Sequence, residues 1–123
     1  MPSEVRILVV DDDELLGRAV KRMLMPYDVT LASGGGEALE EVAEEDFDVI
    51  LCDIMMPEIS GPEFYHRLAD VRPDLQARVL FMTGGALDRM QPMLENVPKR
   101  LVEKPFTRKE LRKVVDEFLD GLG

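Results

Sequence analysis

The sequence is poor in the residues that build metal clusters and disulfide frameworks, because it contains one cysteine, Cys52, and one histidine, His66. A single cysteine cannot form an internal disulfide, and Cys52 lies inside an apolar run, which is typical of a protein from a reducing compartment such as the cytoplasm. With no second histidine and no cysteine cluster, His66 is interpreted as a surface residue rather than a ligand or a base.

Long hydrophobic runs and positive charge are also scarce. No apolar stretch approaches the ~20 residues of a membrane-spanning helix, and the N-terminus shows no signal-peptide pattern, so we expect no membrane contact. The formal net charge of −10 argues against nucleic acid as a direct partner, because a phosphate backbone requires a basic surface. Residues 99–113 are the exception, with seven basic residues and two acidic ones. Apart from Lys104, we interpret this segment as a solvated face.

The remaining pattern fits one globular domain over residues 1–123. The chain is 46% hydrophobic and 33% charged, long enough for one core and too short for two ordinary domains. Short apolar runs alternate with stretches of helical periodicity, which predicts an α/β fold with a parallel sheet and helices on both faces. The expected strands are residues 5–10, 27–32, 48–53, 78–82 and 100–103.

The helices between these strands have amphipathic patterns. The expected inner faces are Leu15, Leu16, Ala19, Val20, Met23 and Leu24 in the first helix, Ala38, Leu39, Val42 and Ala43 in the second, and Phe64, Leu68 and Val71 in the third. Asp13 is placed to cap the first helix, and Thr107 with Glu110 forms a capping box before the last. We interpret residues 33–36, Ser-Gly-Gly-Gly, as a flexible connection. Pro92 and Pro98 predict a short or interrupted helix in residues 86–98. We expect Met90, Met93 and Leu94 in the core rather than on an adaptable contact surface.

Polar residues follow the expected strands where these strands end. Because the carboxyl ends of parallel strands share one edge of the sheet, this edge collects Asp11, Asp12, Asp53, Thr83 and Lys104. Three neighbouring carboxylates repel one another and need protonation or a cation, and such hard oxygen ligands suit Mg²⁺. A carboxylate can also attack phosphorus to give an acyl phosphate, while a hydroxyl and an ammonium group can bind the phosphoryl oxygens.

Four motifs in order carry a resemblance to the receiver domain of two-component response regulators, over nearly the whole chain. They are Leu8-Val9-Val10-Asp11-Asp12, Asp53-Ile54-Met55-Met56-Pro57 with Gly61, Phe81-Met82-Thr83-Gly84, and Lys104-Pro105-Phe106. The resemblance implies a flavodoxin-like (βα)5 fold with strand order 2-1-3-4-5. It also implies a phosphoacceptor switch rather than an enzyme, whose partner is a sensor histidine kinase or a histidine phosphotransfer domain.

The resemblance also implies a role for each matching residue. Asp53 accepts the phosphoryl group, while Thr83 and Lys104 contact it. Mg²⁺ is bound by Asp12 and Asp53 directly, by Asp11 through water and by the backbone carbonyl of Met55. The Lys104-Pro105 peptide bond is expected to be cis.

Two features depart from the family pattern. Leu101 stands three residues before the lysine, where many receivers carry an aromatic switch residue, so the usual output coupling is not expected. The segment between Thr83 and Lys104 lacks the usual long fourth helix, and its Gly84-Gly85 start, Val97-Pro98 and the run from Leu101 to Phe106 are similar to receivers attached to hybrid histidine kinases. Met55 stands two residues after the acceptor, where methionine cannot orient a water molecule, so we expect slow self-dephosphorylation.

Two other readings compete with the phosphorylated switch. A receiver-like interaction module would work without phosphate, but it has no physical reason to keep three repelling carboxylates. An aspartyl-phosphate hydrolase would carry a second acid two residues after the nucleophile, and Met55 occupies that place. The sequence leaves open whether phosphorylation promotes homodimers.

Overall fold

The structure is a computed structural model that describes residues 5–84 and 100–122. The expected strands are confirmed to within one residue at each end. In chain order the elements are β1 (Arg6–Val10), α1 (Glu14–Met23), β2 (Asp28–Ala32), α2 (Gly35–Glu44), β3 (Val49–Asp53), α3 (Gly61–Val71), the 3₁₀ helix η1 (Pro73–Arg78), β4 (Val79–Thr83), β5 (Leu101–Glu103) and α5 (Arg108–Leu122). The helix expected in residues 86–98 and the core positions Met90, Met93 and Leu94 lie outside the described residues.

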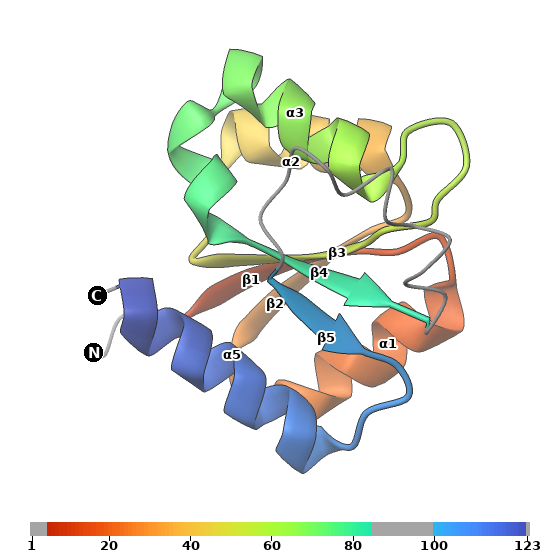
Figure 1. Cartoon of the computed structure of the whole chain (residues 1–123), viewed down its shortest axis with the longest axis vertical. Coiled ribbons are helices and arrows are strands. Elements are labelled where there is room, and N and C mark those ends of the chain that lie inside the picture. Colours follow the sequence, from red (N-terminus) through yellow and green to blue (C-terminus); the bar gives the residue numbers. More distant parts are fainter. Residues whose placement is uncertain (1–4, 85–99, 123) are drawn as a thin grey trace.

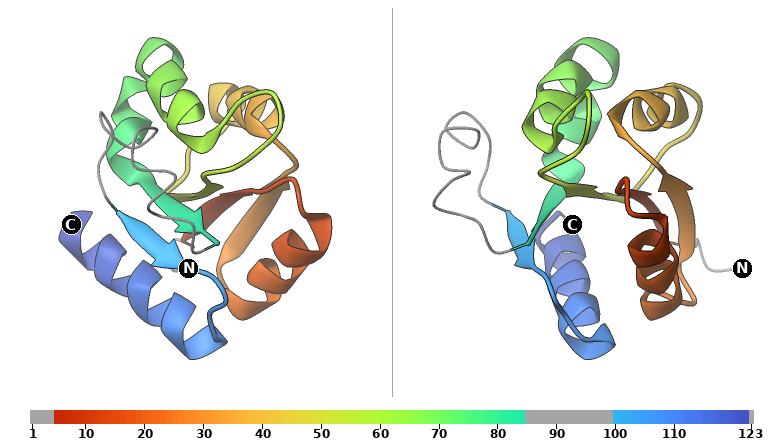
Figure 2. Two further views of the ribbon diagram at one scale, coloured as in Figure 1. Left: turned by 45° about the vertical axis from the view of Figure 1, so that its right-hand side comes forward. Right: turned by 90° about the vertical axis from the view of Figure 1, so that its right-hand side faces the viewer.

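The five strands form one parallel sheet in the order β2-β1-β3-β4-β5, which confirms the expected topology. Helices α2 and α3 cover one face of this sheet, and α1 and α5 cover the other (Figure 1; Figure 2). None of the helices in the described ranges is both long enough and apolar enough to cross a bilayer.

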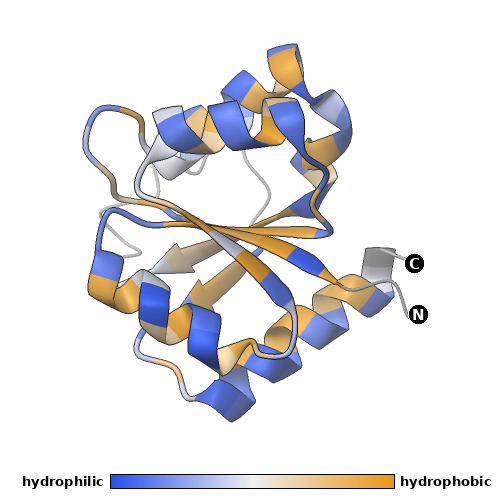
Figure 3. Cartoon of the chain, turned by 180° about the vertical axis from the view of Figure 1, so that it is seen from behind, coloured by the Kyte–Doolittle hydropathy of each residue, from blue (hydrophilic) through white to orange (hydrophobic). Residues whose placement is uncertain are grey.

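Both faces of the sheet are apolar because the central strands alternate their side chains between two cores. Leu8, Ile50 and Phe81 belong to the core under α2 and α3. The neighbouring residues Ile7, Leu51 and Leu80 belong to the core over α1 and α5. Figure 3 shows this as mostly hydrophobic colouring along the central strands and mixed colouring along the helices.

Three residues expected on inner helix faces lie at the surface instead. Leu15 is 77% exposed and Val71 is 45% exposed, and Ala43 is also exposed. Leu15 lies in the first turn of α1, whose buried positions are Gly17 and Val20. Val71 is the last residue of α3, beyond the reach of the core that buries Phe64 and Leu68.

The predicted helix caps are confirmed. The Asp13 carboxylate accepts hydrogen bonds from the backbone N–H groups of Leu15 and Leu16 at 3.1 and 3.2 Å. The backbone N–H of Thr107 donates to the Glu110 carboxylate at 2.8 Å, and the N–H of Glu110 donates to the Thr107 hydroxyl at 3.1 Å. Each cap satisfies donors that the first turn of a helix leaves unpaired.

The basic segment 99–113 is only partly a solvated face, because two of its arginines reach α1. The Arg108 guanidinium donates to the carbonyl oxygens of Met23 and Met25, both at 3.2 Å, and that of Arg112 donates to Met25 at 3.0 Å. Arg112 also lies over the Tyr27 ring, 4.5 Å from its centroid. These cations pair carbonyl groups at the C-terminal end of α1, where positive charge is favourable.

The glycine-rich segment 33–36 is not a flexible connection, since α2 begins at Gly35. The Glu37 carboxylate accepts hydrogen bonds from the Ser33 backbone N–H at 2.6 Å and the Ser33 hydroxyl at 2.7 Å. A Cβ atom on Gly35 would lie 2.8 Å from Cβ and Cγ2 of Ile59, whereas a Cβ on Gly36 would have nothing within 4 Å. Gly35 is therefore required by packing against the loop before α3.

This difference predicts opposite effects for two neighbouring substitutions. Gly35→Ala should destabilise the fold by about 1–3 kcal/mol, because the new methyl group overpacks against Ile59. Gly36→Ala should stabilise it by about 0.5–1 kcal/mol, because alanine lowers the entropy cost of forming the helix. Urea unfolding followed by circular dichroism measures both, and equal stabilisation by the two variants would contradict the close approach at Gly35.

Candidate functional site

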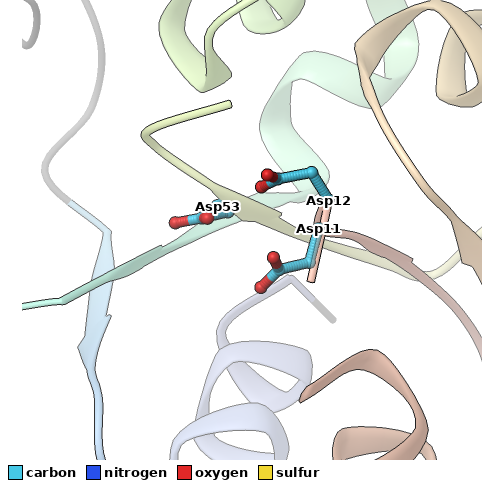
Figure 4. Close-up of side chains that lie close together, drawn as sticks. All are labelled: Asp11, Asp12 and Asp53. Carbon is cyan, nitrogen blue, oxygen red and sulfur yellow. The ribbon is translucent and has the colours of Figure 1, made fainter. Parts of the chain in front are cut away.

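Three carboxylates meet at the carboxyl edge of the sheet. Asp11, Asp12 and Asp53 each offer one oxygen atom, and these atoms all lie within 4.8 Å of one another (Figure 4). Asp53 is the last residue of β3, and Asp11 and Asp12 follow β1, which pairs with β3 in register at Val10 and Cys52. Parallel pairing of two strands that each run into acids thus creates the cluster.

Asp11 is the most enclosed of the three. Its side chain is 1% exposed, its Oδ1 accepts a hydrogen bond from the Asp13 N–H at 2.9 Å, and its own N–H donates to the Ala32 carbonyl at 3.1 Å. Asp12 is exposed. The site therefore has a buried wall at Asp11 and a solvent-facing rim at Asp12.

Lys104 brings a positive charge into the cluster from the segment after β5. Its Nζ lies 3.1 Å from Asp11 Oδ2, to which it donates a hydrogen bond, and 3.5 Å from Asp53 Oδ1. Its backbone N–H donates to the Thr83 carbonyl at 2.7 Å. The Lys104-Pro105 peptide bond is cis, as predicted.

The pKa of the Asp53 carboxyl is shifted by burial and by the neighbouring charges. Burial raises the pKa of the Asp53 carboxyl, the neighbouring charges of Asp11 and Asp12 raise it further, and Lys104 opposes this shift without cancelling it. The side chain is nevertheless 12% exposed. Asp53 is thus an acid whose charge is disfavoured in the unliganded protein but which solvent can still reach.

Thr83 and Met55 complete the set of residues expected at the site. Thr83 ends β4 and is fully buried; in the sheet it pairs with Glu103, directly before Lys104. Met55 lies just beyond β3 with 54% of its surface exposed. All the expected residues therefore lie at the carboxyl ends of their strands.

The loop between β3 and α3 is closed at its base. The Ile54 N–H donates to the Met82 carbonyl at 3.1 Å, and the Ile54 carbonyl accepts from the Gly61 N–H at 2.8 Å. A Cβ atom on Gly61 would clash with the Asp53 carbonyl oxygen and lie 2.9 Å from Ile54 Cα. From the sequence, Gly61 was recognised only as part of the motif after Asp53, and this contact with the strand that carries Asp53 was missed. The one sequence signal for the contact is the position of Gly61 directly before Pro62 at the start of the helix.

The donor atoms of the site fit a hard divalent cation. The three side chains offer carboxylate oxygens, the ligand type that Mg²⁺ prefers, and the exposed rim at Asp12 leaves room for the waters that Mg²⁺ retains. The net charge of the three acids and Lys104 is −2, so a dication would balance it. The cluster is therefore consistent with Mg²⁺ binding.

This geometry predicts that Asp53→Asn stabilises the metal-free protein. The neutral amide removes a desolvated, repelled charge, while Lys104 keeps its 3.1 Å contact with Asp11. We expect a gain of about 1 kcal/mol, or ~4 °C in Tm for a domain of this size. Thermal unfolding in a chelator measures it, with Asp70→Asn on the exposed side of α3 as a control outside the cluster. A lower Tm for Asp53→Asn would contradict the unfavourable charge at this position.

Comparison with known proteins agrees with this geometry. The sequence model described as the response regulator receiver domain matches residues 7–116. The chain is 33% identical over 118 residues to the response regulator receiver protein CpdR of Brucella abortus, and the match covers 93% of this chain and 96% of that protein. Two other curated relatives are longer, and the chain spans 16% and 47% of them.

Solved structures show the same architecture. A CheY-like response regulator receiver domain protein from Methanospirillum hungatei superposes with a TM-score of 0.83 at 29% identity, covering 97% of this chain and 96% of that one. The receiver domain of the sensor histidine kinase PA1611 from Pseudomonas aeruginosa, which holds a magnesium ion in its active-site cleft, gives a TM-score of 0.85 at 23% identity over 96% of this chain and 99% of that one. At that identity the second likeness concerns the fold alone.

The family match covers most of the chain, and the acidic pocket is of the kind typical of phosphoacceptor sites. Membership implies a histidine kinase as the cognate partner. The chain therefore belongs to the response regulator receiver domain family, as a phosphoacceptor module that regulates two-component signal transduction rather than an enzyme.

Proposed function

We propose that Asp53 is the phosphoacceptor of this receiver. A carboxylate oxygen of Asp53 attacks the phosphorus of a phosphohistidine on the partner; the P–N bond breaks, its electron pair returns to the imidazole, and a P–O bond forms on Asp53. The observation that supports this assignment is the placement of Asp53 among Asp11, Asp12 and Lys104 while its side chain stays 12% exposed.

The residues around Asp53 have separate roles in this proposal. Lys104 lies 3.5 Å from Asp53 Oδ1 and would neutralise charge on the transferred group. Thr83, at the end of the adjacent strand, would donate a hydrogen bond from its hydroxyl to a phosphoryl oxygen. After transfer, the Lys104 ammonium and the Thr83 hydroxyl would contact a phosphoryl group with two negative charges instead of the single charge of Asp53. Their interactions would therefore be stronger with the phosphorylated protein.

The oxygen donors of Asp11, Asp12 and Asp53 and the backbone carbonyl of Met55 would hold Mg²⁺. When bound, the ion supplies positive charge that draws the phosphoryl oxygens toward the acids. Asp12 and Asp53 would bind it directly and Asp11 through water. The buried Asp11 wall and its bond to Lys104 then fix the inner side of the pocket.

The phosphate donor in this proposal is a sensor histidine kinase or a histidine phosphotransfer domain in the cytoplasm, and residues 1–123 act as one receiver domain. We also propose that this receiver is related to those attached to hybrid histidine kinases, which the sequence from Leu101 to Phe106 supports. Leu101 pairs with Phe81 in the sheet and packs against the core under α2 and α3. A leucine at this position has no hydroxyl-bearing aromatic ring that could move when the protein is phosphorylated. The signal would therefore reach the output partner by another structural change. Gly85, Val97 and Pro98, the rest of that resemblance, lie outside the described residues.

Phosphorylation by acetyl phosphate tests the assignment. Wild-type protein should gain one phosphoryl group in the presence of Mg²⁺ and none with a chelator, and Asp53→Asn should gain none. Lys104→Gln should slow the reaction by about 10²-fold, because a positive charge aimed at the phosphoryl group is lost. Intact-mass spectrometry and phosphate-affinity gels measure the product.

The matched control is Lys113→Gln, which removes an exposed charge from α5. It should label at the wild-type rate. Labelling of Asp53→Asn at the wild-type level, or labelling that ignores the chelator, would contradict the assignment.

A further inference from the structure

The methionines of the described residues differ sharply in exposure. Met82 is fully buried, and Met23 and Met56 are partly buried. Met25 and Met55 are 57% and 54% exposed. Met25 lies at the C-terminal end of α1, where its carbonyl is bound by arginines of α5. Of this exposed pair, Met55 is the one that follows Asp53 closely in the chain, two residues after the acceptor.

The single thiol does not compete with these thioethers for an oxidant. Cys52 is fully buried, and burial, reinforced by the charges of Asp53 and Asp11, raises the pKa of its thiol. A thiol that stays protonated and out of solvent reacts slowly with peroxides. Oxidative chemistry on this part of the chain therefore falls on exposed methionine.

The loop that carries Met55 holds it close to the acceptor. Both backbone groups of Ile54 are bonded, to Met82 and to Gly61, so the chain leaves β3 along a fixed path. The Cα atoms of Asp53 and Met55 are two residues apart and therefore lie at most about 7 Å from each other. Met55 is thus held near the acceptor with more than half of its surface exposed.

From this placement we propose that Met55 is an oxidation site through which hydroperoxides shorten the lifetime of the phosphorylated protein. The sulfur lone pair attacks one peroxide oxygen, an S–O bond forms and the O–O bond breaks. The sulfur loses two electrons, and hydrogen peroxide leaves as water after proton transfer. The inference rests on phosphorylation of Asp53 as proposed above.

The faster loss of phosphate follows from the change in polarity of the Met55 sulfur when it is oxidised. A thioether is a poor hydrogen-bond acceptor, so native Met55 does not orient water beside the acyl phosphate. A sulfoxide oxygen is a strong acceptor and can hold a water molecule at the rim. One additional net hydrogen bond to the attacking water corresponds to about 3- to 10-fold faster hydrolysis.

The experiment oxidises the full chain with hydrogen peroxide, removes the oxidant, and then phosphorylates the protein with acetyl phosphate and Mg²⁺. Peptide mass spectrometry reads sulfoxide at each methionine, and phosphate-affinity gels follow decay after the donor is removed. Wild-type protein should form sulfoxide at Met55 and Met25 to similar extents and then lose phosphate about 3- to 10-fold faster than untreated protein. Met55→Asn, which places a fixed polar group there, should decay faster without peroxide.

Two variants separate Met55 from the other methionines. In Met55→Leu, treated and untreated samples should decay at one rate. In Met25→Leu, peroxide should accelerate decay as in wild type. The inference is overturned if Met55 resists oxidation while Met25 reacts, if oxidised wild type decays at the untreated rate, or if acceleration persists in Met55→Leu. Failure of untreated protein to take up phosphate would refute the proposed function instead, and the sulfoxide yields would still report on Met55.

Discussion

Mutual repulsion among three carboxylates is the constraint on which the structure of this site depends. Asp11, Asp12 and Asp53 place oxygen atoms within 4.8 Å of one another, and burial raises the pKa of Asp53 further. A fold gains nothing from such an arrangement on its own, since separated acids would be better solvated. The cluster persists because the backbone of the sheet fixes where each acid emerges, and a bound dication would balance its charge.

The sheet enforces this geometry through strand pairing and loop closure. β1 and β3 are neighbours in the middle of a sheet with apolar layers on both faces, so shifting one acid would require moving a buried strand. Gly61 closes the loop after β3 against the Asp53 carbonyl. Lys104, directly after β5, reaches Asp11 and Asp53. The base of the site is buried at Asp11, whereas Asp12 is exposed to solvent.

Much of this arrangement could be predicted from the sequence because the strongest signals were local. Apolar runs that end in acid identified β1 and β3. The failures have a different origin, since they depend on contacts between distant segments. Leu15 and Val71 fit a helical period but lie where no neighbour covers them, and Gly35 is small because Ile59 packs against it.

The basic segment shows the same limit. Its composition indicated a solvated face, but Arg108 and Arg112 pair carbonyl groups at the end of α1, more than eighty residues away in sequence. Charge counting treats every arginine alike, while the fold decides which ones meet a helix terminus. The grouping of the candidate site residues could be predicted without knowledge of such distant contacts. These residues follow the ends of strands, and the parallel topology sets the relative positions of those ends.

The central claim, that the three acids form one binding site for a divalent cation, is tested most directly by calorimetric titration of the metal-free protein with Mg²⁺. We expect one ion per chain, with affinity reduced about 10-fold or more by Asp12→Asn, which leaves the buried Asp11–Lys104 pair intact. Identical isotherms for the wild type and Asp12→Asn, or no binding by a folded wild-type protein at millimolar Mg²⁺, would contradict it.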